Sequence, residues 1–282
     1  MPTIRQALSQ AVQQLRKSES ETPLLDAQVL LAAVLQVERP YLYTHDDEPL
    51  SEEASARFAS WVSRRAAGEP IAYILGVAPW YDRQFIVSPA VLIPRPETEL
   101  LLEQALAFAA QRAQPVAVDI GTGSGALAVT FAAHVPQAHV FAVDMSEDAL
   151  TVARQNAARY QTAITFLHGD LLLPLYDIGD VKIDILMANL PYIATDELPD
   201  LAVTRYEPRM ALDGGADGLD LVRRLLKQAP PLLNEGALIL LEIGADQGAA
   251  ALQLVQEMLK PVDAQIIKDL AGLDRIIRAV MP

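Results

Sequence analysis

The chain has 282 residues, 51% of them hydrophobic, and a net charge of -14, which allows about two domains and excludes disorder on a large scale. The absence of cysteine excludes disulfides and thiolate metal sites, and four histidines without a paired spacing argue against zinc, so we expect no metal. The acidic balance argues against binding to naked nucleic acid and favours small molecules or another protein as partners.

Targeting signals are not evident in the sequence. The first residues, "MPTIRQALSQAVQQL", contain no apolar run long enough for a signal peptide. No stretch approaches the roughly 18 consecutive apolar residues of a membrane span. We therefore expect a soluble cytoplasmic protein that does not bind membranes.

Residues 1–67 show only helical periodicity. Apolar side chains recur at helical spacing over 4–15, 24–35 and 54–62, and Ser51 precedes two glutamates, as is typical of a helix N-cap and an acidic first turn. This segment predicts a small helical bundle domain.

Residues 68–96 break into the short aromatic and β-branched pieces "IAYILG", "WYDRQFIV" and "VLI", separated by glycine and proline. This pattern predicts one or two β-hairpins that link two domains. A helix over "ETELLLEQALAFAA" then begins after Pro96.

Residues 97–282 alternate between apolar strands and amphipathic helices, which predicts an α/β fold with a mostly parallel sheet covered on both faces. The final two strands have no helix between them, so we expect them to be antiparallel. The expected strands lie at about 115–120, 139–143, 163–167, 182–188, 237–243, 263–268 and 274–280. The expected helices lie near 124–134, 146–159, 217–229 and 246–259.

A glycine loop, "VAVDIGTGSGALAV", leads from the first of these strands into a helix through Gly121, Gly123 and Gly125. Glycines permit a tight turn with positive φ and a close approach of backbone amides to a ligand. Asp144 ends the next strand, where a carboxylate can accept both hydroxyls of a ribose. The loop and the acid together predict a nucleoside ligand, although Ala126 also completes a dinucleotide fingerprint, so NAD and S-adenosylmethionine both remain open here.

Two further polar elements follow later strands. In "ITFLHGDLLLPL", Asp170 could accept from an adenine amino group and Leu171 could offer its backbone amide, or Asp170 could simply cap a turn. In "NLPYIA", the strand ends in Asn189-Leu190-Pro191-Tyr192, which proline stiffens into an extended loop at the edge where open α/β sheets bind ligands.

The Asn189 loop distinguishes between the two cofactors. An asparagine oxygen beside outward backbone carbonyls suits an NH2 group, and Tyr192 offers a flat face for stacking. An amide nitrogen is a poor nucleophile until its hydrogens are held and its lone pair is aimed at a methyl donor, so positioning is the main task. This loop favours methyl transfer to a planar amine or amide, unless Asn189 only caps the backbone.

The sequence resembles the bacterial release factor glutamine methyltransferases. The resemblance covers nearly the whole chain and is carried by "LIPRPETELL", "VDIGTGSGALAV", "FAVDMSEDAL", "NLPYI", "YEPRMALDGGADGL" and "LILLEIGADQG". It implies a seven-stranded class I methyltransferase sheet and transfer of a methyl group from S-adenosyl-L-methionine to N5 of the glutamine in the GGQ motif of class 1 peptide chain release factors.

The resemblance also implies domains and site residues. The implied domains are a helical substrate-docking domain (1–67), a β-hairpin linker (68–96) and a methyltransferase domain (97–282). The cofactor would be held by Gly121, Thr122, Gly123, Ser124, Gly125, Asp144, Asp170, Leu171 and Asn189. The glutamine would be held by Asn189, Leu190, Pro191 and Tyr192, with Asn189, Pro191 and Tyr192 as the catalytic set.

The chain departs from the family pattern at two positions. Leu190 replaces the first of two prolines, which removes some stiffness, but Pro191 still restrains it, and we expect the acceptor carbonyls to survive. Leu171 replaces a common aromatic residue. "PRPETE" is expected to close the cofactor pocket, with Arg95 paired either to a carboxylate or, in a surface ion pair, to Glu97 or Glu99. "YEPRMALDGGADG" is expected to pack over the Asn189 loop.

Three other functions compete with this interpretation. An adenine N6-methyltransferase could use the same loop on a flipped base, but the acidic charge argues against DNA. A ribosomal-protein glutamine methyltransferase would differ only in the docked protein. A dinucleotide-binding module without enzymatic activity would keep the glycine loop and Asp144 but would not need Asn189.

Overall fold

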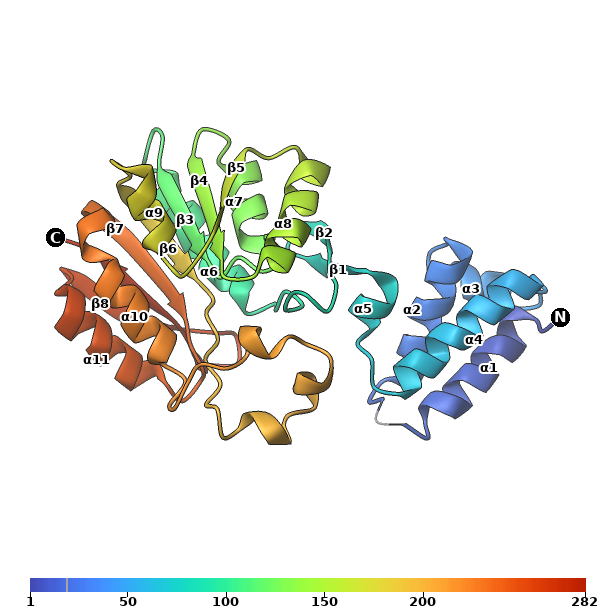
Figure 1. Ribbon diagram of the computed structural model, residues 1–282. Coiled ribbons are helices and arrows are strands. Elements are labelled where there is room, and N and C mark those ends of the chain that lie inside the picture. The colour runs from blue at the N-terminus through green and yellow to red at the C-terminus, as the bar shows by residue number, and fades with distance from the viewer. Residues whose placement is uncertain (19) are drawn as a thin grey trace. The chain divides into compact units, whose positions relative to one another are not determined.

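The computed structural model describes residues 1–18 and 20–282, and Figure 1 shows it as a ribbon. The chain divides into two compact units, Met1–Val77 and Ala78–Pro282. Among the described residues, no helix is both long enough and apolar enough to cross a membrane.

The first unit is a bundle of helices around its own core. The three predicted helices are confirmed as α1 (Ile4–Leu15), α2 (Pro23–Leu35) and α4 (Glu52–Ala66), and a short helix α3 (Tyr41–Thr44) was not predicted. Ser51 is the N-cap of α4, since its hydroxyl accepts from the backbone N–H of Ala54 at 3.1 Å. The fully buried side chains of this core include Ile4, Leu15, Leu30, Leu31 and Leu42.

The segment "IAYILG" is a helix, α5 (Ile71–Leu75), so the predicted strand there was wrong. Pro70 stands at the N-cap and Gly76 ends the helix in the left-handed conformation at φ +72°, which delimits a single helical turn. Ile74 packs into the core of the bundle. Burial therefore overrides the β-branched pattern, and "VLI" (91–93) forms no strand either.

One hairpin of the predicted linker is present, formed by β1 (Val77–Trp80) and β2 (Arg83–Ile86). It is fastened to helix α8 (Glu147–Tyr160) by the buried Asn156. The Asn156 carboxamide accepts from Ile86 N at 2.7 Å and donates to Ile86 O at 2.9 Å and to Ser124 O at 2.8 Å. The same asparagine thus connects the hairpin to the glycine loop.

The second unit contains a seven-stranded sheet in the order β5-β4-β3-β6-β7-β9-β8. The strands are β3 (Val116–Ile120), β4 (His139–Asp144), β5 (Ile164–His168), β6 (Ile183–Ala188), β7 (Leu233–Glu242), β8 (Asp263–Lys268) and β9 (Asp274–Val280). Pairs from β5 to β7 are parallel, and β9 is antiparallel to both β7 and β8. The predicted fold class is confirmed, as is the antiparallel final pair.

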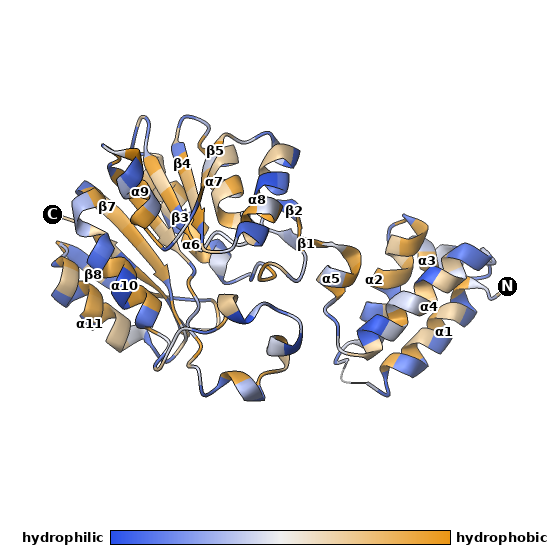
Figure 2. Cartoon of the chain, viewed as in Figure 1, coloured by the Kyte–Doolittle hydropathy of each residue, from blue (hydrophilic) through white to orange (hydrophobic). Residues whose placement is uncertain are grey.

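Helices cover both faces of this sheet, and Figure 2 shows the hydrophobic colour concentrated on its central strands. One face packs on α6 (Thr98–Ala109), α7 (Ala126–His134) and α8, and the other on α9 (Leu173–Ile178), α10 (Asp220–Gln228) and α11 (Gly248–Leu259). Alternate residues of each strand enter the two cores; on β6, for example, Ile185 and Met187 join one and Leu186 and Ala188 the other. This burial on both faces explains the continuous apolar strand sequences.

The elements that the sequence did not predict are all short. Besides α3 and α5, they are α9 and the 3-10 turns η1 (Leu198–Asp200), η2 (Ala202–Arg205), η3 (Arg209–Ala211) and η4 (Pro230–Leu232). Each is too brief to show a helical period in the sequence.

Candidate active site

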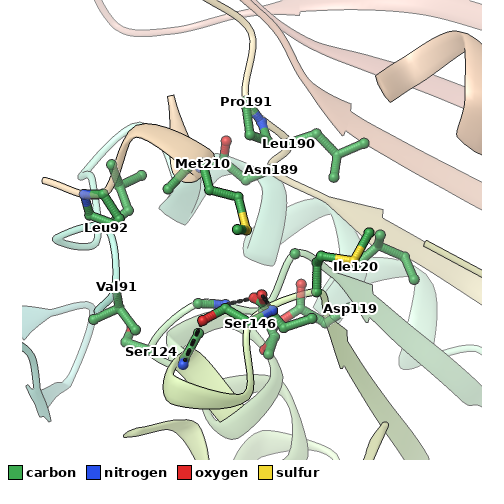
Figure 3. Close-up of a pocket in the computed structure, with 18 of the residues that line it drawn as sticks. Val91, Leu92, Asp119, Ile120, Ser124, Ser146, Asn189, Leu190, Pro191 and Met210 are labelled. Atoms are coloured by element: carbon green, nitrogen blue, oxygen red, sulfur yellow. Dashed lines mark hydrogen bonds between the residues drawn. The ribbon is translucent and has the colours of Figure 1, made fainter. Parts of the chain in front are cut away.

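A cavity of about 670 Å³ lies at the carboxyl ends of the central strands. From β3 the chain continues to β4 and β5 on one side of the sheet, whereas β6 and β7 lie on the other side, so the strand order changes direction between β3 and β6. The loops that follow β3 and β6 both line the cavity. Figure 3 shows Asn189, Leu190 and Pro191 along one wall and Asp119, Ser124 and Ser146 along the opposite wall. A switch point of this kind is where open α/β sheets bind ligands.

The glycine loop contributes one side of the cavity through Gly121, Thr122, Gly123 and Ser124. Gly121 and Gly123 have φ values of +71° and +56°, a conformation that favours glycine. Gly125 does not line the cavity; a Cβ there would lie 3.0 Å from the Cβ of Ala153. Its lack of a side chain therefore allows α7 to pack closely on α8.

Asp144 lines the cavity and holds the glycine loop in place. One carboxylate oxygen accepts from Gly123 N at 2.9 Å and the other accepts from Ser146 N at 2.9 Å. Burial raises the pKa of this carboxyl above its ordinary value. Each oxygen keeps a further lone pair for a ligand.

A second acid, Asp119, lines the cavity but was not predicted from the sequence. Only 2% of it is exposed, and its Oδ2 accepts from Thr122 Oγ1 at 2.7 Å and from Ala128 N at 3.2 Å. Burial raises its pKa to about 7. The available signal was an acid inside an apolar strand, because a buried charge needs a reason to be there.

The Asn189 loop contributes the other side of the cavity. Asn189 is half-buried and lines the cavity with Leu190 and Pro191. Tyr192 lies outside the lining, and its carbonyl accepts from Gln247 Nε2 at 2.8 Å. The loop at 212–215 packs over it as predicted, since Gly214 N donates to Ile193 O at 2.8 Å.

The Asn189 side chain is held by two residues from distant parts of the chain. Its Nδ2 donates to Thr98 Oγ1 at 2.9 Å, and Thr98 Oγ1 donates to Glu242 Oε2 at 2.6 Å. Thr98 and Glu242 are both buried, and burial raises the pKa of Glu242 to about 7. The sequence analysis missed both, although Glu242 is another acid at the end of an apolar strand.

Comparisons with known proteins cover both units. A family model described as the PrmC N-terminal domain matches residues 6–76, and one described as a methyltransferase domain matches residues 117–205. The release factor glutamine methyltransferase of Moorella thermoacetica is 44% identical over 98% of both chains. That of Bacillus subtilis (strain 168) is 38% identical over 100% of this chain and 99% of the relative. The chain belongs to the release factor glutamine methyltransferase family.

Solved structures with lower sequence identity share the fold of this family member. The catalytic domain of hMettl16, in complex with the MAT2A 3'UTR hairpin 6, superposes with a TM-score of 0.56 at 14% identity and covers 82% of each chain. The T. thermophilus 16S rRNA N2 G1207 methyltransferase, in complex with AdoMet and guanosine, gives 0.55 at 17% identity, over 73% of this chain and 50% of that one. The predicted family and class I methyltransferase fold are therefore confirmed.

Asp170 and Leu171 also line the cavity of this family member. Arg224 of α10 forms an ion pair with Asp170, so part of that carboxylate is already engaged. Leu171 is buried and has a φ of +52°, an uncommon conformation for a residue with a side chain. Strained backbone of this kind is typical of binding sites.

Leu190, the departure from the usual family loop, fills space beside the glycine loop. It is buried in the sheet core, and its Cδ2 would lie 3.3 Å from a Cβ placed on Gly121. A side chain at position 121 would thus press against the Asn189 loop. The leucine and the glycine fix the distance between the two walls.

Arg95 of the "PRPETE" segment lines the cavity and pairs with Glu207 at 2.6 Å. The same carboxylate accepts from Ile93 N at 3.2 Å. The expected surface pair with Glu97 or Glu99 was wrong, because the buried Glu207 reaches the linker from the loop that follows η2. This pair joins the linker to the loop over the cavity.

Proposed function

We propose that this chain transfers a methyl group from S-adenosyl-L-methionine to the N5 amide nitrogen of the glutamine in the GGQ motif of class 1 peptide chain release factors. The observation that carries the proposal is the Asn189 side chain, whose Nδ2 is engaged by Thr98 while the residue itself lines the cavity. Its Oδ1 is thus available to accept a hydrogen bond from a bound carboxamide.

The cavity fits the cofactor of this family. The glycine loop would hold it through Gly121, Thr122, Gly123 and Ser124, and the Asp144 carboxylate has lone pairs left for ribose hydroxyls. Adenine would lie against the backbone of Leu171, with Asp170 nearby. Asp119 adds a buried carboxyl that a positive ligand would favour in its ionised form.

The chain's own residues would position the substrate. The cofactor, when bound, supplies an electrophilic methyl group on a sulfonium. Asn189 Oδ1, together with a carbonyl of Asn189 or Leu190, would accept the two hydrogens of the glutamine amide and keep its nitrogen aimed at the cofactor. Transfer would replace one of the amide hydrogens by the methyl group, and the hydrogen that leaves as a proton is one of the two held by Asn189 Oδ1 and the loop carbonyl.

Pro191 and Tyr192 would hold the Asn189 loop in the conformation that this arrangement requires. Pro191 restricts Leu190 to extended angles, which keeps the carbonyls directed outward. Tyr192 lies outside the cavity lining and its carbonyl is bonded to Gln247, so we assign it to fixing the loop.

We assign the helical N-terminal segment to docking the release factor and the second unit to methyl transfer. The acidic net charge of -14 supports a protein substrate over a nucleic acid, because phosphate contacts need a basic face. A release factor substrate places this activity in the cytoplasm. The adenine-directed alternative predicts methylated DNA instead.

The direct test is incubation of the purified protein with a class 1 release factor and isotope-labelled S-adenosyl-L-methionine, followed by mass mapping of the label. We expect one methyl group on the GGQ glutamine. A release factor with that glutamine replaced is the matched control and should stay unlabelled. Label on a ribosomal protein, on DNA or on another residue would overturn the assignment.

A further inference from the structure

We propose that Thr98 and Glu242 are positioning residues that fix which end of the Asn189 carboxamide faces the cavity. The inference rests on the proposed function, because it concerns how Asn189 presents an acceptor to the substrate amide. It adds two residues from outside the Asn189 loop to the machinery of methyl transfer.

The Thr98 hydroxyl has a single hydrogen. That hydrogen is donated to Glu242 Oε2 at 2.6 Å, so the oxygen can only accept from the Asn189 side chain, 2.9 Å away. Asn189 must therefore turn its NH2 group toward Thr98. Its oxygen, which is the group that a substrate NH2 requires, is left for the cavity.

If the Asn189 amide were turned over, it would lose its hydrogen bonds both to Thr98 and to the substrate. Asn189 Oδ1 would face the Thr98 oxygen, which has no hydrogen left to give, and two acceptors in a buried site repel each other. The NH2 group of Asn189 would then face the NH2 group of the glutamine. Neither could accept, and the nitrogen to be methylated would lose its alignment.

The three groups come from three separate elements and meet where little water enters. Thr98 is the first residue of α6, Glu242 is the last residue of β7, and Asn189 follows β6. Exposure is 7% for Thr98 and 2% for Glu242. Thr98 also lines the cavity, but this low exposure leaves little room for water at its hydrogen bonds, which favours one firmly held orientation.

Glu242 is a buried acid that is only partly satisfied by hydrogen bonds. Within residues 1–18 and 20–282, its Oε1 has no hydrogen-bond partner, and a buried carboxylate with one unpartnered oxygen is costly. Among the residues that the structure describes, its hydrogen-bond partner is the Thr98 hydroxyl. A buried acid with one unpartnered oxygen, whose other oxygen supports a cavity residue, is typical of a functional site.

Protonation of Glu242 provides an independent readout. A proton on Oε2 would turn Glu242 into a donor to Thr98, and the freed hydroxyl hydrogen could then point at Asn189 Oδ1 and favour the wrong orientation. Burial raises the pKa of Glu242 to about 7; the charges of Arg275 and Arg95 oppose this rise, Glu97 adds to it, and the Tyr192 hydroxyl also feels the Glu242 charge. Methyl transfer should therefore weaken as the pH falls below about 7.

The test compares Thr98→Val, which keeps the shape and removes the hydroxyl, with Thr98→Ser, which restores the hydroxyl. Thr130→Val is the matched control, since Thr130 is fully buried on α7 and its hydroxyl has no partner in the described part of the chain. The readouts are single-turnover methyl transfer to the release factor, KM for the release factor, the Kd of the demethylated cofactor, and the melting temperature.

We expect Thr98→Val to lower kcat about 10- to 100-fold, as a small misplacement of reacting groups does. KM and the cofactor Kd should stay within about twofold, Thr98→Ser should recover most of the rate, and Thr130→Val should match the wild type. A Thr98→Val rate within twofold of Thr130→Val would overturn the inference. A wild type that labels no release factor would instead overturn the proposed function.

A second variant keeps the inference testable if Thr98→Val does not fold. Glu242→Gln cannot take up the proton, so its kcat should be nearly independent of pH between about 6 and 8, where the wild type loses rate on the acid side. If kcat fell by the same factor at acidic pH in Glu242→Gln and in the wild type, the role given to Glu242 would be contradicted.

Discussion

The two walls of the cavity are built in different ways. The cofactor wall consists of neighbours in sequence and in strand order, since the glycine loop and Asp144 are 21 residues apart and bonded directly to each other. The opposite wall, which we call the transfer wall, is formed by the loop from Asn189 to Pro191. Its arrangement depends on hydrogen bonds between residues far apart in the sequence: Thr98 and Asn189 are separated by 91 positions, and Thr98 and Glu242 by 144. The cofactor site is thus encoded locally, whereas the orientation of the catalytic amide is a product of the whole sheet.

The largest effect should come from the transfer wall itself. Asn189→Ala removes the acceptor for the substrate amide and should lower kcat by about 10²- to 10³-fold or more, as loss of a preorganised hydrogen-bonding group does. Single-turnover methyl transfer to the release factor measures it. Melting temperature and cofactor binding are the controls and should change little, because Asn189 is a half-buried loop residue. Full turnover in this variant would end the role given to Asn189.

Asp144→Ala should break the cofactor wall and leave the other intact. The variant loses the carboxylate that accepts from Gly123 N and Ser146 N, and any ribose contact, so we expect the Kd of the cofactor to rise about 10- to 100-fold. Isothermal titration calorimetry measures this Kd. The KM for the release factor should be unchanged at saturating cofactor. An equal increase in the Kd of the cofactor and in the KM for the release factor would mean that the two walls do not act independently.

A smaller effect should appear in the pH dependence of cofactor binding. A cationic ligand favours ionised Asp119, so binding should release a proton wherever Asp119 is protonated in the free protein, that is, below its raised pKa of about 7. Cofactor affinity should therefore rise with pH, by up to about tenfold per pH unit, and level off above about 7. Calorimetry in buffers of different ionisation enthalpy measures the released proton.

Asp119→Asn is the variant that sharpens this comparison. It should abolish the proton release while methyl transfer at saturating cofactor stays close to that of the wild type. If cofactor affinity changed with pH in the same way in the variant and the wild type, the released proton would come from another group, such as Asp144, whose pKa burial also raises.

Much of the fold could be predicted because its elements are long and periodic. The strands of the sheet are apolar and separated by amphipathic helices, and their bounds in the structure lie within a few residues of those expected. The exceptions lie in the linker: "VLI" (91–93) forms no strand, and "IAYILG" carries a strand-like composition but is buried against the bundle as the helical turn α5. The local composition of a segment does not report how that segment packs against the rest of the domain.

The site divides in the same way. Gly121, Asp144 and Asn189 could be predicted because each stands next to the end of an apolar strand, where parallel sheets bind ligands. Thr98 and Glu242 could not be assigned a partner, since their meeting depends on how α6 and β7 pack against β6. Asp119 and Glu242 did leave one signal in the sequence, an acidic residue within an apolar strand.

When a carboxamide is bound, Asn189 should present its oxygen to it while its nitrogen donates to Thr98. The decisive measurement is a crystal structure of the complex with the demethylated cofactor and a glutamine-containing release factor, combined with ¹⁵N NMR of the Asn189 side-chain NH2 to assign its nitrogen. We expect Asn189 Oδ1 within about 3.2 Å of the glutamine nitrogen, with an NH2 proton bonded to Thr98. A glutamine bound away from Asn189, or an NH2 group of Asn189 that faces the glutamine, would contradict it.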